Sequence, residues 1–430
     1  MSQQNMTTIQ ISNGRLIDPK SGTDAKKDVF IADGRIAAIG RAPAGFQPGR
    51  VIDAAGLVVA PGFVDLSARL REPGFEHKAT LESEMQAAVA GGVAHLAIPP
   101  DTEPPLDEPG LVQMLKYRAR GLHLAHVHPL GALTQGLGGK RLTEMVELIE
   151  AGCVAFSQAN VAISDSEVLW RAMQYASTFA YTVWLRPQDA FLSKLGVAHD
   201  GEVATRLGLP GIPAFAETIA LGTILELVRA TGTRVHIARL STAAAVAMIK
   251  AAKAEGLPVS CDVSAHHVHL SDMDLGYYDA QCHLVPPLRS RRDRDALRAG
   301  LADGTVDAIC SDHTPVDEDE KLLPFGESTP GATGLELLLP LTLKWASESK
   351  LSFAAALSRI TCDPARILCI AAGELAVGRA ADVCVFDAAA QVTLTTQGLK
   401  SQGKNTPFLG YELPGKVRYT LVDGAVVYEA

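Results

Sequence analysis

The sequence predicts an α/β protein, a (β/α)8 TIM barrel with a small β-sandwich domain built from both chain termini. Strand-like apolar runs alternate with helical segments through the middle of the chain, eight times over about 250 residues, which is typical of this barrel. Both ends lack that alternation and read as short strands joined by glycine turns. At 430 residues the chain is long enough for a barrel and a second, smaller unit.

The first sixty residues are expected to form short strands. The segments TIQISNGRLI, DVFIADGRIAAIG and VIDAAGLVVAPG alternate apolar and polar residues around NG, DG and similar turns, a pattern that predicts hairpins. The C-terminal segments ADVCVFDAAAQVTL and VRYTLVDGAVVYEA have the same character. We therefore predict one composite domain from residues 1–60 and 371–430, with the barrel over residues 61–370.

The middle of the chain supplies the barrel. Its expected strands are GFVDLSARL, VAHLAIP, LAHVHPLG, CVAFS, YTVWLRP, RVHIARLS, PVSCDVSAHH and VDAICSDH. Helices are expected in TLESEMQAAVAGG, SEVLWRAMQYASTF, AETIALGTILELVRATG, AAAVAMIKAAKAEG and DRDALRAGLADG, several of which end at a glycine. A doubly wound open sheet is the alternative, but no GxGxxG motif follows an early strand.

Composition narrows the class of protein. The net charge is −9 with acidic residues spread along the chain, which argues against a nucleic-acid or anionic-membrane partner. Seven scattered cysteines without a CxxC pair favour reduced thiols, and Cys261 and Cys310 read as core. The N-terminal segment has no signal-peptide pattern, and no apolar run reaches the roughly 18 residues that span a bilayer. We expect a cytoplasmic protein.

Candidate site residues lie where the predicted strands end, because the chemistry of such barrels gathers at the carboxyl ends of their strands. The polar or notable residues at these ends are Ser67, Arg69, Arg71, Pro100, Asp101, Glu103, Gln158, Arg186, Arg239, His266, His267, Asp312 and His313.

Several long segments carry a resemblance to a known family. Taken in order, PGFVDLSARLREPG, VHIARLSTA, PPLRSRRDRDALRAGLADGTVDAICSDHTP, PGATGLELLLPLTL and NTPFLGYELPGKV make the chain resemble dihydroorotase of the amidohydrolase superfamily over almost its whole length. The resemblance implies opening or closure of a cyclic amide at the barrel mouth. In the family, zinc activates a water there and an aspartate at the end of the last strand moves the proton.

The same resemblance implies that the metal site has degenerated. The family's metal-ligand positions correspond here to Ser67, Arg69, Gln158, Arg186 and Arg239. An arginine side chain stays protonated and offers no lone pair to a metal. We therefore expect no stoichiometric zinc, no other cofactor, no dihydroorotase activity and no catalytic residues, with Asp312 and Arg71 as vestiges of the site.

Positions that contact substrate in the family also differ. The segment PDTEP places Asp101 and Glu103 where amides are expected, and Val285 replaces an asparagine. The charge of Glu103 should repel a dicarboxylate such as carbamoyl-aspartate. We expect Arg69, Arg186 and Arg239 to converge on the old metal position, with Asp312 and either Asp101 or Glu103 as counter-charges. An arginine nitrogen should then lie within about 3.5 Å of Asp312.

Two HVH segments, at residues 126–128 and 267–269, are the remaining candidates for metal binding. On a strand, residues i and i+2 point the same way, so either pair could chelate a metal. Ordinary packed or surface histidines are the favoured reading.

The chain most resembles the non-catalytic dihydroorotase-like chains of bacteria that associate with aspartate carbamoyltransferase. This resemblance implies an inactive subunit that supports assembly of the aspartate carbamoyltransferase catalytic chain in pyrimidine biosynthesis. By analogy with the family barrel, we expect the subunit itself to be a homo-oligomer, a dimer. Two alternatives stay open: an active zinc-dependent cyclic amidohydrolase with an unusual ligand set, and a metal-free barrel that binds a small anion.

Overall fold

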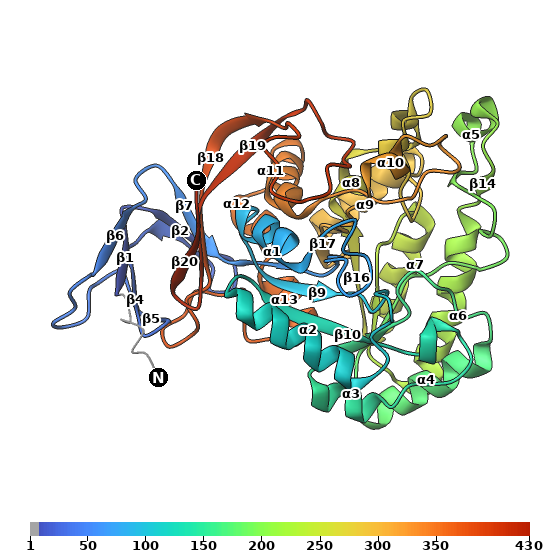
Figure 1. Ribbon diagram of the computed structural model, residues 1–430, viewed down its shortest axis with the longest axis horizontal. Helices are drawn as coiled ribbons and strands as arrows, with labels where there is room; N and C mark the ends of the chain where they lie inside the picture. The colour runs from blue at the N-terminus through green and yellow to red at the C-terminus, as the bar shows by residue number, and fades with distance from the viewer. Residues whose placement is uncertain (1–7) are drawn as a thin grey trace.

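The computed structural model describes residues 8–430, so part of the N-terminal segment expected to lack a leader, residues 1–7, lies outside the described residues. Figure 1 shows β-sheets at one end of the molecule and a helix-clad barrel at the other. The blue N-terminal strands and the red C-terminal strands lie side by side in the sheets (Figure 1).

Eight parallel strands form the barrel; seven lie within predicted segments, and β10 runs one residue beyond the segment LAHVHPLG. The predicted fold class is therefore confirmed. In sheet order the strands are β8 (Phe63–Asp65), β9 (Val93–Ile98), β10 (His126–Ala132), β11 (Ala155–Ser157), β12 (Val183–Leu185), β15 (Val235–Ile237), β16 (Val259–Ser264) and β17 (Ala308–Cys310).

The first and last strands meet through the segments that follow them. The amide of Arg69 donates to the carbonyl of His313 at 2.9 Å, and the amide of His313 donates to the carbonyl of Ser67 at 3.1 Å. Below them, the amide of Ser311 donates to the buried carboxylate of Asp65 at 2.7 Å. These bonds nearly close the barrel and bring the two ends of the sheet to one mouth.

Helices cover the outside of the barrel. The larger ones are α1 (Leu81–Ala90), α2 (Pro109–Leu122), α3 (Met145–Ala151), α4 (Ser166–Thr178), α6 (Phe215–Thr231), α7 (Ala243–Ala254), α9 (Arg291–Asp303) and α11 (Leu338–Glu348). The shorter ones are α5 (Glu202–Leu207), α8 (Ala265–His269), α10 (Glu318–Lys321), α12 (Phe353–Ser358) and α13 (Cys362–Leu368). All five predicted helical segments are helices. Polar caps fix several starts; Thr80, for example, forms a capping box with Ser83.

Alternation along the strands separates two apolar layers. Leu96 of β9 packs outward with the helices, whereas Ala97 of the same strand and Leu130 of β10 belong to a smaller cluster inside the barrel. The interior cluster also contains Val64 and Trp184. This plug of apolar side chains separates the mouth of the barrel from its opposite, N-terminal end.

The sheets at the other end come from both termini. The four-stranded sheet has the order β5 (Arg35–Ile39), β4 (Val29–Ala32), β1 (Ile9–Ser12), β6 (Arg50–Asp53). The six-stranded sheet has the order β20 (Ala425–Glu429), β19 (Glu412–Val422), β18 (Val383–Thr393), β7 (Val58–Pro61), β2 (Arg15–Asp18), β3 (Thr23–Lys26). Apolar residues from both sheets, among them Ile11, Val59 and Leu421, share one core. The exact domain limits stay a prediction.

Two of the predicted hairpins are wrong. The NG turn at residues 13–14 joins β1 to β2, which lie in different sheets, and the AAG segment joins β6 to β7 in the same way. The reason is burial, because Ile11 and Leu16 on either side of the NG turn both pack into the core between the sheets. The DG turns, between β4 and β5 and between β19 and β20, form antiparallel hairpins as predicted, and β2 and β3 form a further one.

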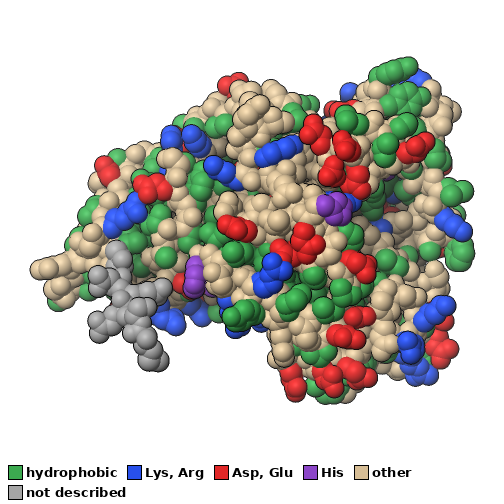
Figure 2. Space-filling model, in the orientation of Figure 1, with side chains coloured by type: hydrophobic (Ala, Val, Ile, Leu, Met, Phe, Trp, Pro, Cys, Tyr) green, Lys and Arg blue, Asp and Glu red, His purple; other side chains and the backbone are tan. Residues whose placement is uncertain are grey.

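The cysteines, the helix lengths and the surface charges bear on the expectations drawn from the composition. The seven cysteines are free, and burial raises the pKa of the Cys261 and Cys310 thiols, as expected for core residues. Within residues 8–430, no helix has the length and apolar character needed to cross a bilayer. The face drawn in Figure 2 mixes acidic and basic side chains.

Candidate functional site

The polar residues at the barrel mouth sit on strained backbone. Arg71, Arg239 and Asp312 have φ values of 63°, 57° and 46°, in the left-handed region that residues other than glycine seldom occupy. Each follows the end of a barrel strand. Such strain persists only where the surrounding structure holds it, and it gathers at functional sites. The mouth is therefore the candidate functional site.

Asp312 is the centre of the site. Its Oδ1 accepts from Nη1 of Arg239 at 2.9 Å, from Nη1 of Arg69 at 3.4 Å and from Oγ of Ser67 at 3.4 Å. Both arginines are nearly buried, with side chains 4% and 5% exposed. The expected arginine nitrogen within about 3.5 Å of Asp312 is present, so a charge-assisted network occupies this position.

A second carboxylate completes the pairing of Arg69. Nε of Arg69 donates to Oδ2 of Asp101 at 2.9 Å. Burial would raise the pKa of Asp101, but Arg69 outweighs it and the pKa is lowered. Burial likewise opposes the charge of Arg69, whose pKa Asp101 and Asp312 nevertheless raise. Of the two proposed counter-charges, Asp101 is in place, whereas Glu103 is exposed and its side chain forms no ion pair among the described residues.

Arg186 does not reach Asp312 as expected. Its Nε and Nη2 donate to the side-chain and backbone oxygens of Asn160, at 3.1 and 3.0 Å. The same Asn160 side chain accepts from Nη2 of Arg239 at 2.7 Å. Burial, followed by repulsion from Arg239, lowers the pKa of Arg186 to about 9. An amide thus bridges two cations that would otherwise face each other.

Asn160, two residues after Gln158 in the segment FSQAN, was not among the residues predicted from the sequence. Gln158, the residue singled out there, turns away from the arginines. Its amide nitrogen donates to Thr134 Oγ1 and to the carbonyl of Leu137, both at 2.8 Å. These hydrogen bonds hold Gln158 against the loop at residues 134–137, which forms a wall of the mouth. Asn160, and not Gln158, therefore bridges the two arginines.

The remaining candidates lie at the edge of the site or behind it. Nε of Arg71 donates to the carbonyl of Pro315 at 2.8 Å, and burial followed by the charge of Arg69 lowers its pKa to about 10. His266 and His267 are buried and contact backbone carbonyls, with pKa values that burial lowers to about 4.

The chelating pair considered at residues 267–269 is ruled out by secondary structure. These residues lie in helix α8, where positions i and i+2 do not face the same way. His267 contacts the carbonyl of Pro286, whereas His269 contacts the carbonyl of Leu341 at 2.8 Å. The seventh strand, β16, ends at Ser264, and helix α8 begins at the next residue, Ala265. The sequence pattern did not indicate this change.

A layer of buried carboxylates holds the strand ends in place. Glu84 of α1 accepts from His313 at 2.6 Å, Asp262 accepts the amide of Arg239 at 2.6 Å, and Glu217 accepts the amide of Ser241 at 2.8 Å. Together with Asp65, these groups hold the segments that follow β15 and β17. Buried carboxylates satisfied in this way are costly to remove.

The residues at the mouth do not fit a zinc ion. A zinc site needs three or four neutral imidazole, thiolate or carboxylate donors around one point. Around Asp312 the described groups are two guanidinium ions and a serine hydroxyl, and the carboxylate already accepts from all three. Of the buried histidines at the strand ends, His266 and His267 contact backbone carbonyls and His313 contacts Glu84.

A cavity opens beside Arg186. It has a volume of about 250 Å³ and is lined by Arg186, Gln158, Gln188 and apolar residues such as Ile163 and Phe191. Arg186 has no carboxylate partner within the described part of the chain. The cavity therefore offers a positive group to a small molecule.

The barrel, its polar mouth and the sandwich of terminal strands define an amidohydrolase-type protein. The sequence matches the family model "Dihydro-orotase-like" over residues 56–245 and the "Amidohydrolase family" model over residues 169–428. It is 46% identical to a dihydroorotase-like protein of Pseudomonas aeruginosa over 98% of this chain and 100% of that protein. The chain belongs to the dihydroorotase-like family of the amidohydrolase superfamily.

Other relatives carry an enzyme name or share the fold. A protein named dihydroorotase from Geobacter sp. is 41% identical over 98% of this chain and 99% of that protein. The L-hydantoinase structure from Arthrobacter aurescens superposes with a TM-score of 0.88 at 23% identity, covering 99% of this chain and 96% of that one. At that identity the likeness concerns the fold alone.

Proposed function

We propose that this chain is a catalytically inactive dihydroorotase-like subunit that supports assembly of aspartate carbamoyltransferase in pyrimidine biosynthesis. The observation that carries the proposal is the ion-pair network of Asp312 with Arg69 and Arg239. These arginines stand at positions where the family resemblance expects metal ligands.

Hydrolysis of a cyclic amide needs an activated water and a carboxylate that can take its proton. In this chain Oδ1 of Asp312 already accepts hydrogen bonds from Arg69, Arg239 and Ser67, so this oxygen is not free to accept a proton from a water. The guanidinium groups also occupy the space where lone-pair donors would have to converge. Charge substitution for a metal ion would preserve the shape of the mouth and remove its chemistry.

Exposed apolar side chains support a partner that covers the mouth. Phe191, Leu195, Tyr277 and Leu322 lie on loops that follow barrel strands, and their exposures are 78%, 79%, 88% and 77%. Figure 2 shows hydrophobic side chains gathered at the barrel end of the molecule. Apolar groups gathered in this way commonly mark protein interfaces. We assign this rim to contact with aspartate carbamoyltransferase, and we propose that the chain is itself a dimer.

Co-expression with aspartate carbamoyltransferase from the same organism tests the assembly role. The two chains should co-purify in one complex whose mass gives the stoichiometry. Deleting the gene for this chain should lower transcarbamoylase assembly and leave cellular dihydroorotase activity intact. Loss of dihydroorotase activity with normal transcarbamoylase assembly would overturn the proposal.

Restoring the first-strand ligands should not restore catalysis. The double variant Ser67→His, Arg69→His regains two imidazoles, but Arg239 still projects its charge onto Asp312 and Arg186 remains beside it. Residues that act as one unit give little activity until the whole set is present. We expect no metal-dependent turnover of dihydroorotate. Measurable turnover in this variant, absent from the single Ser67→His control, would contradict the argument.

A metal-free anion-binding barrel is a second candidate, favoured by unsatisfied donors. Nη2 of Arg69 and Nε of Arg239 are buried without a hydrogen-bond partner among residues 8–430, and such groups commonly contact a water or an ion. Calorimetric titration with carbamoyl-aspartate and with inorganic phosphate tests it. Binding that Arg186→Gln weakens would support this role, and absence of binding to both would exclude these ligands.

A further inference from the structure

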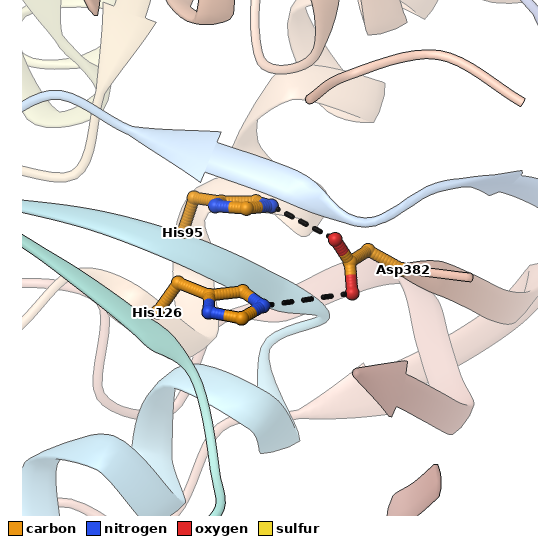
Figure 3. A group of neighbouring side chains, drawn as sticks. All are labelled: His95, His126 and Asp382. Atoms are coloured by element: carbon orange, nitrogen blue, oxygen red, sulfur yellow. Dashed lines mark hydrogen bonds and ion pairs between the residues drawn. The ribbon is translucent and has the colours of Figure 1, made fainter. Parts of the chain in front are cut away.

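A cluster of histidines and aspartates lies at the end of the barrel opposite to the mouth. His95 is the third residue of β9 and His126 is the first residue of β10, and the two are register partners in the parallel pair. Asp382 stands just before β18, in the segment that enters the terminal sheets. Figure 3 shows both imidazoles directed at the two oxygens of the Asp382 carboxylate.

The donor atoms lie close enough together to share one metal ion, because one ligand atom from each of His95, His126 and Asp382 lies within 4.8 Å of the others. Nε2 of His95 lies 3.1 Å from Oδ2 of Asp382, and Nε2 of His126 lies 3.8 Å from Oδ1. Asp423, in the turn between β19 and β20, places its Oδ2 3.4 Å from the same nitrogen of His126. A metal with bonds of about 2.1 Å to tetrahedral ligands separates those ligands by about 3.4 Å.

Hydrogen bonding alone explains this arrangement less well. Nε2 of His126 is 3.4 and 3.8 Å from its two carboxylate oxygens, both longer than the usual 2.9–3.0 Å of an N–H···O bond. The nitrogen sits between two anionic oxygens at a distance that suits a shared cation.

Neighbouring groups form hydrogen bonds with the proposed ligands and fix their orientation. Nδ1 of His95 faces Nε2 of His128 at 3.1 Å, so a metal on Nε2 of His95 would leave the Nδ1 proton to be donated to His128. The amide of Asp423 donates to Oδ1 of Asp382 at 2.8 Å. Metal-binding histidines and carboxylates are typically held by such partners, which fix their direction and tautomer.

We propose that His95, His126 and Asp382, with Asp423 as a fourth ligand, bind a divalent transition-metal ion, zinc by the character of the set. Two imidazoles and two carboxylates suit zinc better than calcium or magnesium. His95 and Asp382 are buried, whereas His126 is 35% and Asp423 63% exposed, so an ion can enter from the surface. The metal would join two barrel strands to the terminal sheets.

The role inferred for this ion is structural and independent of the proposed assembly function. The apolar plug inside the barrel, which includes Ala97 and Leu130, lies between this cluster and Asp312. An ion here would therefore supply no chemistry to the mouth. The expectation of a chain without zinc would then hold only for the mouth, and the HVH segment at residues 126–128 would contribute His126 as a ligand and His128 as its support.

Zinc titration of the full-length chain without a polyhistidine tag tests the proposal. The wild type should bind one zinc per chain and unfold about 3 °C higher at a hundredfold excess over Kd. His126→Ala and Asp423→Asn, both at exposed ligands, should weaken binding about tenfold or more and reduce the thermal shift. His77→Ala, at an exposed histidine elsewhere, and Asp312→Ala, at the mouth, should bind as the wild type does.

Three results would overturn the proposal. The first is absence of stoichiometric zinc from the wild type. The second is unchanged affinity in both ligand variants. The third is loss of binding in Asp312→Ala, which would put the ion at the mouth. Thermal unfolding of each variant without zinc shows that it is folded, so loss of binding can be assigned to loss of a ligand.

Discussion

Asp312→Ala should lower the free energy of unfolding by about 3–5 kcal/mol, because it leaves two buried guanidinium groups without their shared anion. Arg69 would keep Asp101, and Arg239 would keep only Asn160 and the carbonyl of Val285. Chemical denaturation of the purified protein measures the loss. In an active relative the same change would be judged by activity; here we expect its main effect on stability.

Two further variants make this measurement specific. Asp295→Ala removes a carboxylate that is 63% exposed and paired with Arg294 on the surface, so it should change stability by no more than about 0.5 kcal/mol. Adding Arg239→Met to Asp312→Ala removes one stranded cation and should recover part of the loss. A stability of Asp312→Ala equal to that of the wild type would show that the arginines do not depend on this carboxylate.

Glu84→Ala should also cost about 3–5 kcal/mol of unfolding free energy. The Glu84 carboxylate is fully buried and accepts from His313 and Ser401 at 2.6 Å and from the amide of Gln402 at 2.9 Å. Its removal leaves hydrogen-bond donors without an acceptor, both on the segment after the last barrel strand and on the C-terminal segment. Glu82→Ala, on the exposed face of the same helix, is the matched control and should stay within about 0.5 kcal/mol.

The same carboxylate gives stability a pH dependence. Burial would raise the pKa of Glu84, but hydrogen bonds from His313 and Ser401 lower it below its usual 4.5. A carboxylate whose pKa is depressed by folding adds stability above its unfolded pKa, and that stability is lost as the pH falls through the folded value. The wild type should therefore lose stability below about pH 4.5, with a smaller slope in Glu84→Ala. Equal slopes in both proteins would exclude this origin.

The fold could be predicted from the sequence because the hydrophobic pattern is strong at each barrel strand. The run VAHLAI is buried throughout, and several of the helices between strands start at a polar cap, Thr80 and Thr242 among them. The NG turn at residues 13–14 was predicted to form a hairpin because its local chemistry is that of a hairpin. Burial of Ile11 and Leu16 between two sheets decides its path, and that is a tertiary effect.

Contacts within the site could be predicted where a residue type accepts only one kind of interaction partner. An arginine at the end of a buried strand needs an anion, and Asp312 and Asp101 are the ones within reach of Arg69. Glu103, two residues from Asp101, points to solvent, and no local pattern distinguishes the two. Asn160 and Glu84 gave no signal of their own, because their roles arise from neighbours 79 and 229 residues away along the chain.

Turnover of dihydroorotate by the purified chain in saturating zinc tests the central claim most directly. The account predicts a rate indistinguishable from that of Asp312→Ala, with or without His126→Ala, because an ion at the far end of the barrel cannot serve the mouth. Zinc-dependent turnover that Asp312→Ala abolishes and His126→Ala leaves intact would contradict it, since it would show a working metal centre beside Asp312.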